Sequence, residues 1–192
     1  MDHLGTQPLQ TGRLVLRRFT VDDAEVMFGN WASDPEVTRW LRWNPHRSWV
    51  ETAEYLHEVT KQYGRPDFYD WAIQVRASGV VIGSISLIRA EPDPAWAAAC
   101  RKLGEAWEPG YCIGRKWWSR GYATEALCAV RDYWFDQVGG QWLCCCHAND
   151  NVASGAVMEK AGFRYHHSGV SHRFDGTEVP CRFYALLKGM NP

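Results

Sequence analysis

The chain has 192 residues, of which 46% are hydrophobic and 22% charged, the balance of a soluble globular protein with one sizeable core. Its formal net charge of −1 gives no long-range attraction for a polyanion, so composition argues against broad nucleic-acid binding. Apolar runs stay well short of the ~20 residues of a membrane span, and the polar N-terminal stretch lacks the apolar segment of a signal peptide. We therefore expect one cytoplasmic domain over residues 1–192.

The pattern of the first half predicts a half-buried strand, two capped helices and a β-hairpin. The first helix opens on Thr20 with acidic residues in its first turn, and the second opens on Ser48 with Glu51 at the capping-box spacing. The expected ranges are 13–19 for the strand, 20–32 and 48–63 for the helices, and 69–75 and 80–88 for the hairpin.

The second half begins with a proline-containing segment, 89–106, for which we expect a loop or a loop with one helical turn. Alternating strands and helices follow, and a polar turn joins the last two strands. The whole order predicts an α/β fold with a mixed, largely antiparallel sheet flanked by helices, in a single domain. The expected ranges are 107–114, 141–147, 162–170 and 181–188 for strands, and 121–137 and 151–162 for helices.

Cysteines and tryptophans are the unusual part of the composition. The seven cysteines predict neither a disulfide framework nor a metal site, because their number is odd and C-x-x-C spacing is absent. Cys144, Cys145 and Cys146 stand together in an apolar run and are expected to be buried free thiols in a strand. The tryptophans of the polar, turn-rich region 31–49 are candidates for walling a pocket; these are Trp31, Trp40, Trp43 and Trp49.

The stretch "KWWSRGYATEAL", residues 116–127, places Gly121 between a predicted strand and a predicted helix. A helix start leaves its first N–H groups without partners and carries a partial positive charge, so it binds anions well. Gly121 lets the backbone come close to such an anion, and Arg120 adds a cation. A helix start with an incidental glycine explains the same twelve residues. The P-loop and dinucleotide glycine motifs are both absent.

Three segments then resemble one family in its own order: "TGRLVLRRFTVDDAEVMFGNWASDPEV", "EPGYCIGRKWWSRGYATEAL" and "HANDNVASGAVMEKAGFRY". They are similar to the GNAT superfamily of N-acetyltransferases, and most similar to its branch of ribosomal-protein N-terminal acetyltransferases, RimJ and RimL. The resemblance covers almost the whole chain. It implies a GNAT-type fold and acetyl-CoA (coenzyme A) as the co-substrate, without a metal.

By this resemblance, the turn 118–124 is the pyrophosphate loop, with backbone N–H groups as donors. The family pattern has Gln or Arg three residues before the glycine, where this chain has Trp118, so Arg120 would have to supply any side-chain contact. A backbone N–H of the strand before the loop would meet the oxyanion. The implied cofactor-binding residues are Cys112, Ile113, Gly114, Trp118, Ser119, Arg120, Gly121, Tyr122, Ala123, Thr124, Asn151 and Ser154.

Two candidates for proton transfer from the amine follow. Glu108 stands where the family's E-x-G-Y pattern has its glutamate, so it is the first candidate for the base or for amine binding; the alternative is an exposed carboxylate at a strand end. His147 ends a predicted strand and could relay a proton, or it could simply be hydrogen-bonded there.

The candidate proton donor to the departing thiolate is Ser154. It lies three residues after Asn151, so both lie near one face of the helix start, and the resemblance implies contacts with the pantetheine arm and sulfur. Helix capping is the alternative role for both. Tyr165 and Tyr184 carry further hydroxyls in the last strands, where sheet packing is the more common role.

These residues predict an acetyl-CoA-dependent N-acetyltransferase that uses direct attack by a primary amine, without a covalent enzyme intermediate. The resemblance implies a protein or peptide α-amine as acceptor. Alternatives are a small-molecule amine (polyamine, amino acid or aminoglycoside), a non-catalytic acyl-CoA-binding protein, and an aromatic nucleic-acid-binding sheet. Segments 31–49 and 89–104 are expected to form the acceptor site. Assembly as a homodimer stays open.

Overall fold

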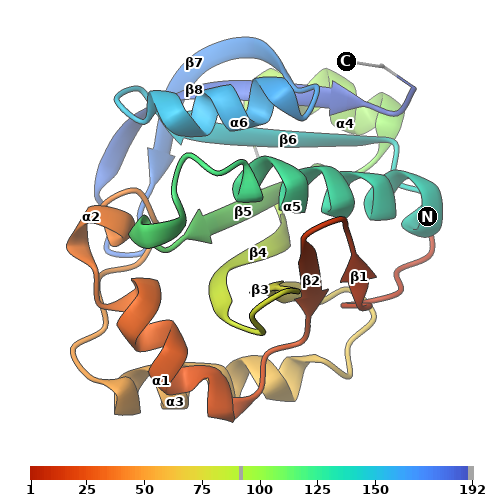
Figure 1. Cartoon of the computed structure of the whole chain (residues 1–192). Coiled ribbons are helices and arrows are strands. Elements are labelled where there is room, and N and C mark those ends of the chain that lie inside the picture. Colours follow the sequence, from red (N-terminus) through yellow and green to blue (C-terminus); the bar gives the residue numbers. More distant parts are fainter. Residues whose placement is uncertain (91–92, 190–192) are drawn as a thin grey trace.

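The computed structural model describes residues 1–90 and 93–189. Its strands form two antiparallel sheets with helices packed on both sides, which confirms the predicted α/β class (Figure 1). The five-stranded sheet has the order β1-β2-β3-β4-β5, and the three-stranded sheet has the order β6-β8-β7. The strands are β1 Leu9–Gln10, β2 Leu14–Arg17, β3 Tyr69–Val75, β4 Val81–Arg89, β5 Trp107–Ile113, β6 Trp142–Ala148, β7 Arg164–His172 and β8 Glu178–Leu187.

The helices cover the sheets from different sides. In Figure 1, α5 and α6 lie in front, whereas α1 and α3 lie below the first sheet. The α-helices are α1 Ala24–Met27, α2 Pro35–Thr38, α3 Trp49–Gln62, α4 Ala97–Leu103, α5 Tyr122–Asp132 and α6 Val152–Lys160. Short 3-10 turns span Val21–Asp23, Pro94–Trp96 and Arg115–Trp117, and π-helical turns span Phe28–Ala32 and Tyr133–Val138.

The first sheet has an apolar core on each face. On one face, alternate residues such as Trp71 and Ile85 pack with Leu127 of α5. We call this the α5 face. On the other face, Ala72 and Cys112 pack with helices that include α3. We call this the α3 face. Since successive residues of a strand point to opposite sides, each strand of this sheet contributes side chains to both faces.

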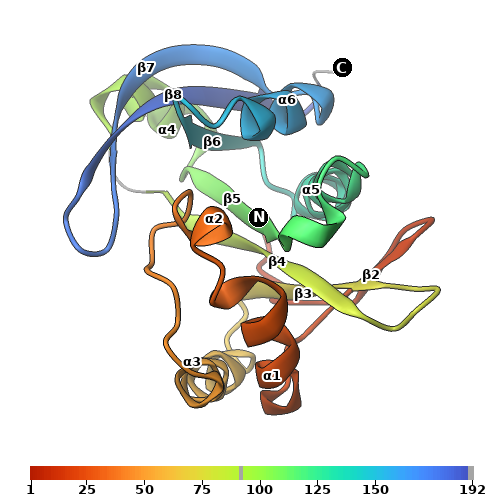
Figure 2. The same cartoon turned by 60° about the vertical axis from the view of Figure 1, so that its left-hand side comes forward.

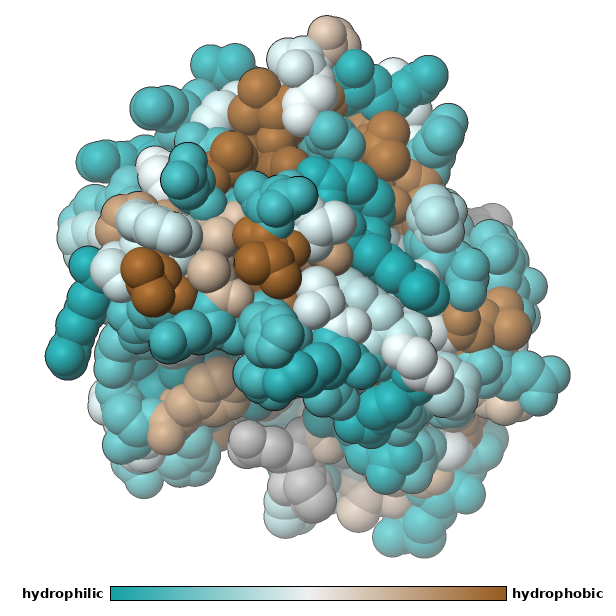
Figure 3. All heavy atoms as spheres, turned by 90° about the horizontal axis from the view of Figure 1, so that it is seen from below, coloured by the Kyte–Doolittle hydropathy of each residue, from teal (hydrophilic) through white to brown (hydrophobic). Residues whose placement is uncertain are grey.

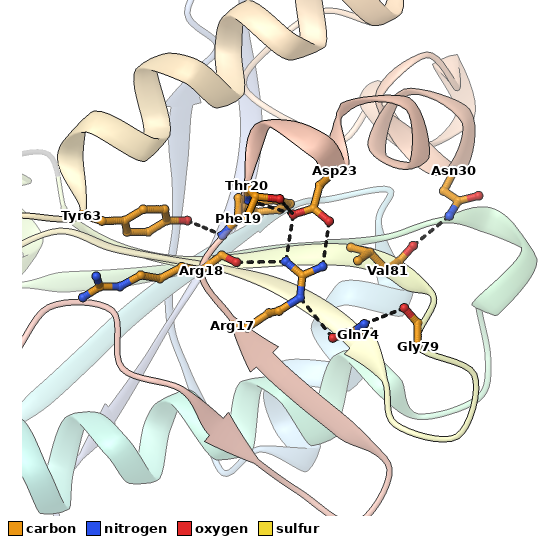
Figure 4. A network of polar contacts seen from close by, with 10 residues as sticks. All are labelled: Arg17, Arg18, Phe19, Thr20, Asp23, Asn30, Tyr63, Gln74, Gly79 and Val81. Atoms are coloured by element: carbon orange, nitrogen blue, oxygen red, sulfur yellow. Dashed lines mark hydrogen bonds and ion pairs between the residues drawn. The ribbon is translucent and has the colours of Figure 1, made fainter.

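The predicted first helix is present over residues 21–32, but its hydrogen-bond pattern changes along its length. A 3-10 turn precedes α1 and a π turn follows it. Asp23 stabilises the 3-10 turn before α1. Its carboxylate accepts hydrogen bonds from the Thr20 N–H at 2.8 Å and from the Arg17 guanidinium at 2.7 and 2.8 Å (Figure 4). Burial raises the pKa of Asp23, but the Arg17 and Thr20 hydrogen bonds outweigh it and leave the pKa lowered.

The predicted cap of α3 is confirmed, with one difference. Ser48 Oγ accepts from the Glu51 N–H at 3.2 Å, as expected. The Glu51 carboxylate accepts from the N–H of Arg47, one residue earlier than in a standard capping box, at 2.6 Å.

Segment 89–106 is more helical than predicted, since α4 continues the 3-10 turn for seven residues. Trp96 supplies the reason: it is 3% exposed and packs on Trp142, with ring centroids 5.5 Å apart. Residues 91–92 of this segment lie outside the described residues. The sequence also failed to predict β1 and α2, which are only two and four residues long, and it predicted one sheet where there are two.

The lower surface is formed partly by α3 and the first helical segment. Figure 3 shows this side, where hydrophobic residues lie in small groups between hydrophilic ones. One shallow hollow here is lined by Val21, Val50 and Ala53 together with Glu54, His57 and Glu58. Within the described parts of the chain, no helix combines the length and apolar character needed to cross a membrane.

Candidate active site

The two sheets meet where β5 and β6 run side by side. Cys144 Sγ lies 3.8 Å from the Trp107 carbonyl oxygen, and Cys146 Sγ lies 3.4 Å from Glu108 Oε1. These contacts follow the same order along both strands, as parallel neighbours require. Within the described residues the two strands belong to separate sheets, without a ladder between them. Their facing edges therefore offer backbone N–H and C=O groups to a molecule bound between them.

The loop after β5 has the backbone conformation of an anion site. Ser119 and Gly121 both adopt positive φ, 58° and 77°, on either side of Arg120. Within residues 1–90 and 93–189, the N–H groups of these three residues donate to no protein acceptor. Successive N–H groups in such a turn, followed by the N-terminus of α5, form a concave donor set that suits a phosphate group.

Gly114 and Trp118 fix how the loop leaves β5. A Cβ on Gly114 would lie 2.5 Å from the Asn30 carbonyl oxygen, so only glycine fits there. Trp118 Nε1 donates to the Ile113 carbonyl oxygen at 2.6 Å. The indole N–H is therefore already hydrogen-bonded within the protein, so Trp118 can contact a ligand only through the apolar surface of its ring. The Arg120 side chain is exposed.

A clamp between the β1–β2 turn and the start of α5 holds this loop. Glu125 accepts from Thr11 Oγ1 at 2.5 Å, from the Arg13 N–H at 2.9 Å and from Arg13 Nε at 2.6 Å. Arg13 also donates to the Arg120 carbonyl oxygen at 2.9 Å. Burial raises the pKa of Glu125, but the hydrogen bonds from Thr11 and Arg13 outweigh it, so the pKa is lowered and the clamp is charged.

Ser154 meets a tyrosine that the sequence did not single out. Tyr111 Oη lies 2.9 Å from Ser154 Oγ and donates to the Ser154 carbonyl oxygen at 3.1 Å. Asn151 Oδ1 accepts from the Ser154 N–H at 3.3 Å, so Asn151 caps α6. Burial raises the pKa of Tyr111 well above its usual range. Its hydroxyl therefore stays protonated, and the Tyr111–Ser154 pair can donate a hydrogen bond on the α5 face.

Glu108 lies on the opposite face of β5. It alternates with Gly110 and Cys112, and Cys112 belongs to the core of the α3 face. Arg42 Nη2 lies 3.5 Å from Glu108 Oε2, and the two side chains are 25% and 15% exposed. Gly110 is exposed although β5 is the strand next to the second sheet. The α3 face is therefore open to solvent beside Glu108.

His147 lies apart from Glu108. Its Nδ1 is 2.8 Å from the Ala148 carbonyl oxygen, and its Nε2 is 3.3 Å from Tyr184 Oη. Its Nε2 would lie 2.7 Å from a Cβ on Gly155, so the ring packs tightly under α6. Both ring nitrogens have partners within the protein, and the residue is 6% exposed.

The other aromatic candidates divide between core and surface. Trp31 is fully buried in the core of the α3 face and walls no open pocket, which corrects that expectation. Trp49 is 51% exposed, whereas Trp40 and Trp43 are half-buried. Tyr165 Oη bonds Ser168 Oγ at 3.0 Å, and Tyr184 is buried against His147.

The buried thiols of β5 and β6 are unsuited to nucleophilic attack, because burial raises their pKa. All seven cysteines are free, and Cys144 and Cys145 are buried as predicted, whereas Cys146 is half-buried. Burial raises the pKa of Cys112 to about 11, and its Sγ lies 3.3 Å from Ser84 Oγ. In the described residues, no group of three or more His, Cys, Asp or Glu side chains is arranged to hold a metal.

Sequence reasoning missed Tyr111, Arg42 and the Glu125 clamp. Tyr111 follows Gly110 in the quoted "EPGY" motif, so its place next to the glutamate was visible, but its contact with Ser154 depends on how β5 and α6 pack. Arg42 and Glu125 carry no local signal, because their partners Glu108 and Arg13 are distant in sequence.

Comparison with known proteins agrees with this geometry. Residues 13–164 match the acetyltransferase (GNAT) domain family, so the chain belongs to the GNAT family of acetyltransferases. N-acetyltransferase YoaA of Bacillus subtilis is 28% identical over 183 residues, which cover 94% of this chain and 96% of YoaA.

Two solved structures show the same fold. One is a candidate ribosomal-protein-serine acetyltransferase from Vibrio cholerae, with a TM-score of 0.77, 20% identity, and coverage of 97% of this chain and 99% of that one. The other is the microcin C7 self-immunity acetyltransferase MccE in complex with acetyl-CoA and AMP. It has a TM-score of 0.72, 13% identity, and coverage of 92% and 93% of the two chains.

Proposed function

We propose that this acetyltransferase uses acetyl-CoA to acetylate the α-amine of a protein or peptide, as in the RimJ and RimL branch. The observation that carries the proposal is the arrangement of groups about β5. The anion loop and the Tyr111–Ser154 pair lie toward α5 and α6, and Glu108 lies on the open α3 face. A thioester held between β5 and β6 would meet a proton donor on one side and an amine on the other.

The residues of the loop fit the cofactor. Gly121 and the N–H groups of Ser119, Tyr122, Ala123 and Thr124 would hold the pyrophosphate, while Cys112, Ile113 and Gly114 carry the backbone that faces the bound thioester. Acetyl-CoA supplies the activated acetyl group. In this proposal Asn151 holds the start of α6, so that the Ser154 hydroxyl faces the sulfur with Tyr111 behind it. His147 packs α6 in place and takes no proton.

On the α3 face, Glu108 attracts the acceptor ammonium or removes its proton. An α-amine has a pKa near 8, whereas a lysine amine has a pKa near 10.4. Deprotonation at neutral pH therefore costs about 1 kcal/mol for the α-amine and several for lysine. Because the site offers the Glu108 carboxylate beside the Arg42 guanidinium, it suits an α-amine, which is easier to deprotonate than a lysine amine. The Vibrio cholerae neighbour described as acting on a ribosomal protein supports the same acceptor class.

A small-molecule amine is the second candidate, because MccE was solved with AMP. A thiol-release assay with acetyl-CoA separates the two when peptides, polyamines, amino acids and aminoglycosides are compared at equal concentration. The proposal expects kcat/KM to be highest for peptides with a free N-terminus. N-terminal formylation should abolish the reaction. Preference for a polyamine or an aminoglycoside, or CoA binding without turnover, would refute it.

A further inference from the structure

A second carboxylate, Asp70, lies buried on the same α3 face as Glu108. Asp70 is on β3, opposite Ser86 of β4, and Ser86 is opposite Gly110 of β5. Directly opposite residues of paired strands share a face. The three residues therefore form a polar row across the sheet, from a residue that is 8% exposed to one that is open to solvent.

Ser86 occupies the middle of this row. Its Oγ lies 3.5 Å from the Gly110 carbonyl oxygen, and it would lie 3.4 Å from a Cβ on Gly110. The hydroxyl therefore reaches over the exposed glycine. Asp70 and Gly110 are two strand spacings apart, roughly 10 Å, which is too far for a direct contact between the Asp70 carboxylate and a group above Gly110. Ser86 stands between them, one strand spacing from each. Its hydroxyl donates to the Gly110 carbonyl oxygen in this conformation, so it has to turn about its Cα–Cβ bond to reach the Asp70 carboxylate.

No cation holds Asp70 in its charged form. Within the described residues, no Lys, Arg or His lies within salt-bridge distance of the Asp70 carboxylate. The titratable groups that face it are Tyr55 and Tyr63 from α3 and its C-terminal end, and Cys112 from β5. Burial raises the pKa of all three, so they are neutral near pH 7. Burial raises the pKa of Asp70 to about 7, and the Trp71 N–H opposes this rise.

Tyr55 of α3 extends from the surface toward this carboxylate. Its side chain is 41% exposed. Its hydroxyl nevertheless lies deep enough for burial and the nearby Asp70 and Cys112 to raise its pKa. The region between α3 and the sheet thus joins a solvent-exposed ring to the buried carboxylate.

Resting on the proposed function, we propose that Asp70 is the final acceptor of the proton that the acceptor amine loses, and that Ser86 passes this proton on. The ammonium above Gly110 gives a proton to Ser86 Oγ as the Ser86 hydroxyl proton moves to the Asp70 carboxylate. This leaves a neutral amine, an intact serine and a carboxylic acid that returns its proton to solvent after turnover. Glu108, held beside Arg42, binds the ammonium and keeps its charge.

The proton balance favours this division of roles. For proton transfer from an α-amine with a pKa near 8 to an ordinary aspartate with a pKa near 4, the equilibrium constant is about 10⁻⁴. For transfer to a carboxylate with a pKa of about 7, the equilibrium constant is about 0.1. A general base works best when its pKa lies near the working pH.

The test compares Asp70→Asn and Ser86→Ala with Asp67→Asn and Ser84→Ala, using a peptide acceptor from about pH 6 to about pH 9. Asp67 is partly exposed and paired with Arg65, and Ser84 bonds Cys112, so both controls lie outside the row. Asp70→Asn and Ser86→Ala should lower kcat at pH 7 at least tenfold with unchanged acetyl-CoA affinity by calorimetry. The deficit should shrink above about pH 8, where solvent supplies the neutral amine. The controls should keep the wild-type profile.

Two further readouts separate this role from a structural one. An acceptor amine that is already neutral at pH 7 should restore the Asp70→Asn rate to the wild-type value, whereas Glu108→Gln should raise KM for the peptide with a smaller change in kcat. If Asp70→Asn keeps the wild-type kcat and pH profile while the wild type acetylates peptides, the Asp70 role is wrong and the proposed function stands. If the wild type acetylates no amine, the proposed function itself is wrong.

Discussion

The Tyr111–Ser154 pair has two hydroxyl protons, and one of them is available to the departing thiolate. Tyr111 Oη lies near both Ser154 Oγ and the Ser154 carbonyl oxygen, so Ser154 is the group left to face the ligand. We expect Ser154→Ala to lower kcat more than it raises KM for acetyl-CoA, because the contact strengthens as charge develops on sulfur. Steady-state kinetics measure both.

Asn151 provides the control for this prediction. It caps α6 through the Ser154 N–H, which Ser154→Ala keeps. Asn151→Ala should cost about 1 kcal/mol of stability in denaturant unfolding, whereas Ser154→Ala should not. An unchanged kcat in Ser154→Ala would leave Ser154 with a packing role.

Asp70 also predicts a pH dependence of stability. Its pKa is raised by burial from 3.8 to about 7 in the folded state, so the folded state binds more protons than the unfolded state between these values. The free energy of unfolding therefore decreases, through Asp70, as the pH rises from about 4 to about 7. Asp70→Asn should be more stable than the wild type at pH 8, by at most about 4 kcal/mol. The difference should vanish near pH 4 in urea titrations; a less stable variant at pH 8 would contradict this.

Residue identities could be predicted only where the signal is local. Gly121 was found from its place between strand and helix, and the structure gives it positive φ. Ser48 was found from its spacing to Glu51. Asp70 and Ser86 could not be found, because each stands in an ordinary strand pattern and their relation appears only when β3, β4 and β5 are in register.

At the scale of elements, the Glu125 clamp joins the start of α5 to the β1–β2 turn. The Glu125 side chain is 18% exposed, and its charge holds Arg13, which in turn holds the Arg120 carbonyl oxygen. Glu125→Gln keeps the shape and weakens the ionic contact. Acetyl-CoA affinity should fall by about threefold to tenfold, or about 0.6–1.4 kcal/mol, when measured by calorimetry.

A surface variant is the control for this effect. Glu58 also pairs with a cation, Lys61, at 2.7 Å, but on the exposed side of α3. Glu58→Gln should leave acetyl-CoA affinity unchanged. Equal affinities for Glu125→Gln and the wild type would mean that the loop keeps its conformation without the clamp.

Element prediction succeeded where periodicity and caps are strong. The β3–β4 hairpin and α3 agree closely with their predicted ranges. The helix over 20–32 is also present, although its change from 3-10 to α to π hydrogen bonding was not predicted. The helix α4 was underestimated because its stability comes from Trp96 packing against the second sheet. Such tertiary contacts leave no periodic pattern in the sequence.

At the scale of the whole molecule, the β7–β8 hairpin of the second sheet reaches the segment between α2 and α3. Figure 2 shows the hairpin extending beside that segment. Arg173 makes the connection, with donations to the Arg39 and Trp43 carbonyl oxygens at 3.2 and 3.0 Å and to Asn44 Oδ1 at 2.7 Å. The Phe174 N–H adds a bond to the Arg42 carbonyl oxygen at 2.8 Å. The second sheet thus positions Arg42 beside Glu108.

Arg173→Ala should therefore act on the acceptor and spare the cofactor. The Arg173 side chain is only 15% exposed, so removing its hydrogen bonds should cost about 1–3 kcal/mol and release the segment that carries Arg42. We expect KM for a peptide acceptor to rise at least fivefold, since 1.4 kcal/mol corresponds to about tenfold. Acetyl-CoA affinity should stay within about twofold, because the loop around Gly121 lies on the other side of β5. Arg182→Ala is the matched control: Arg182 stacks on Tyr165 at 4.7 Å and belongs to the same hairpin, but on the face toward α6. If both variants raised KM equally, the effect would come from loosening the hairpin and not from the position of Arg42.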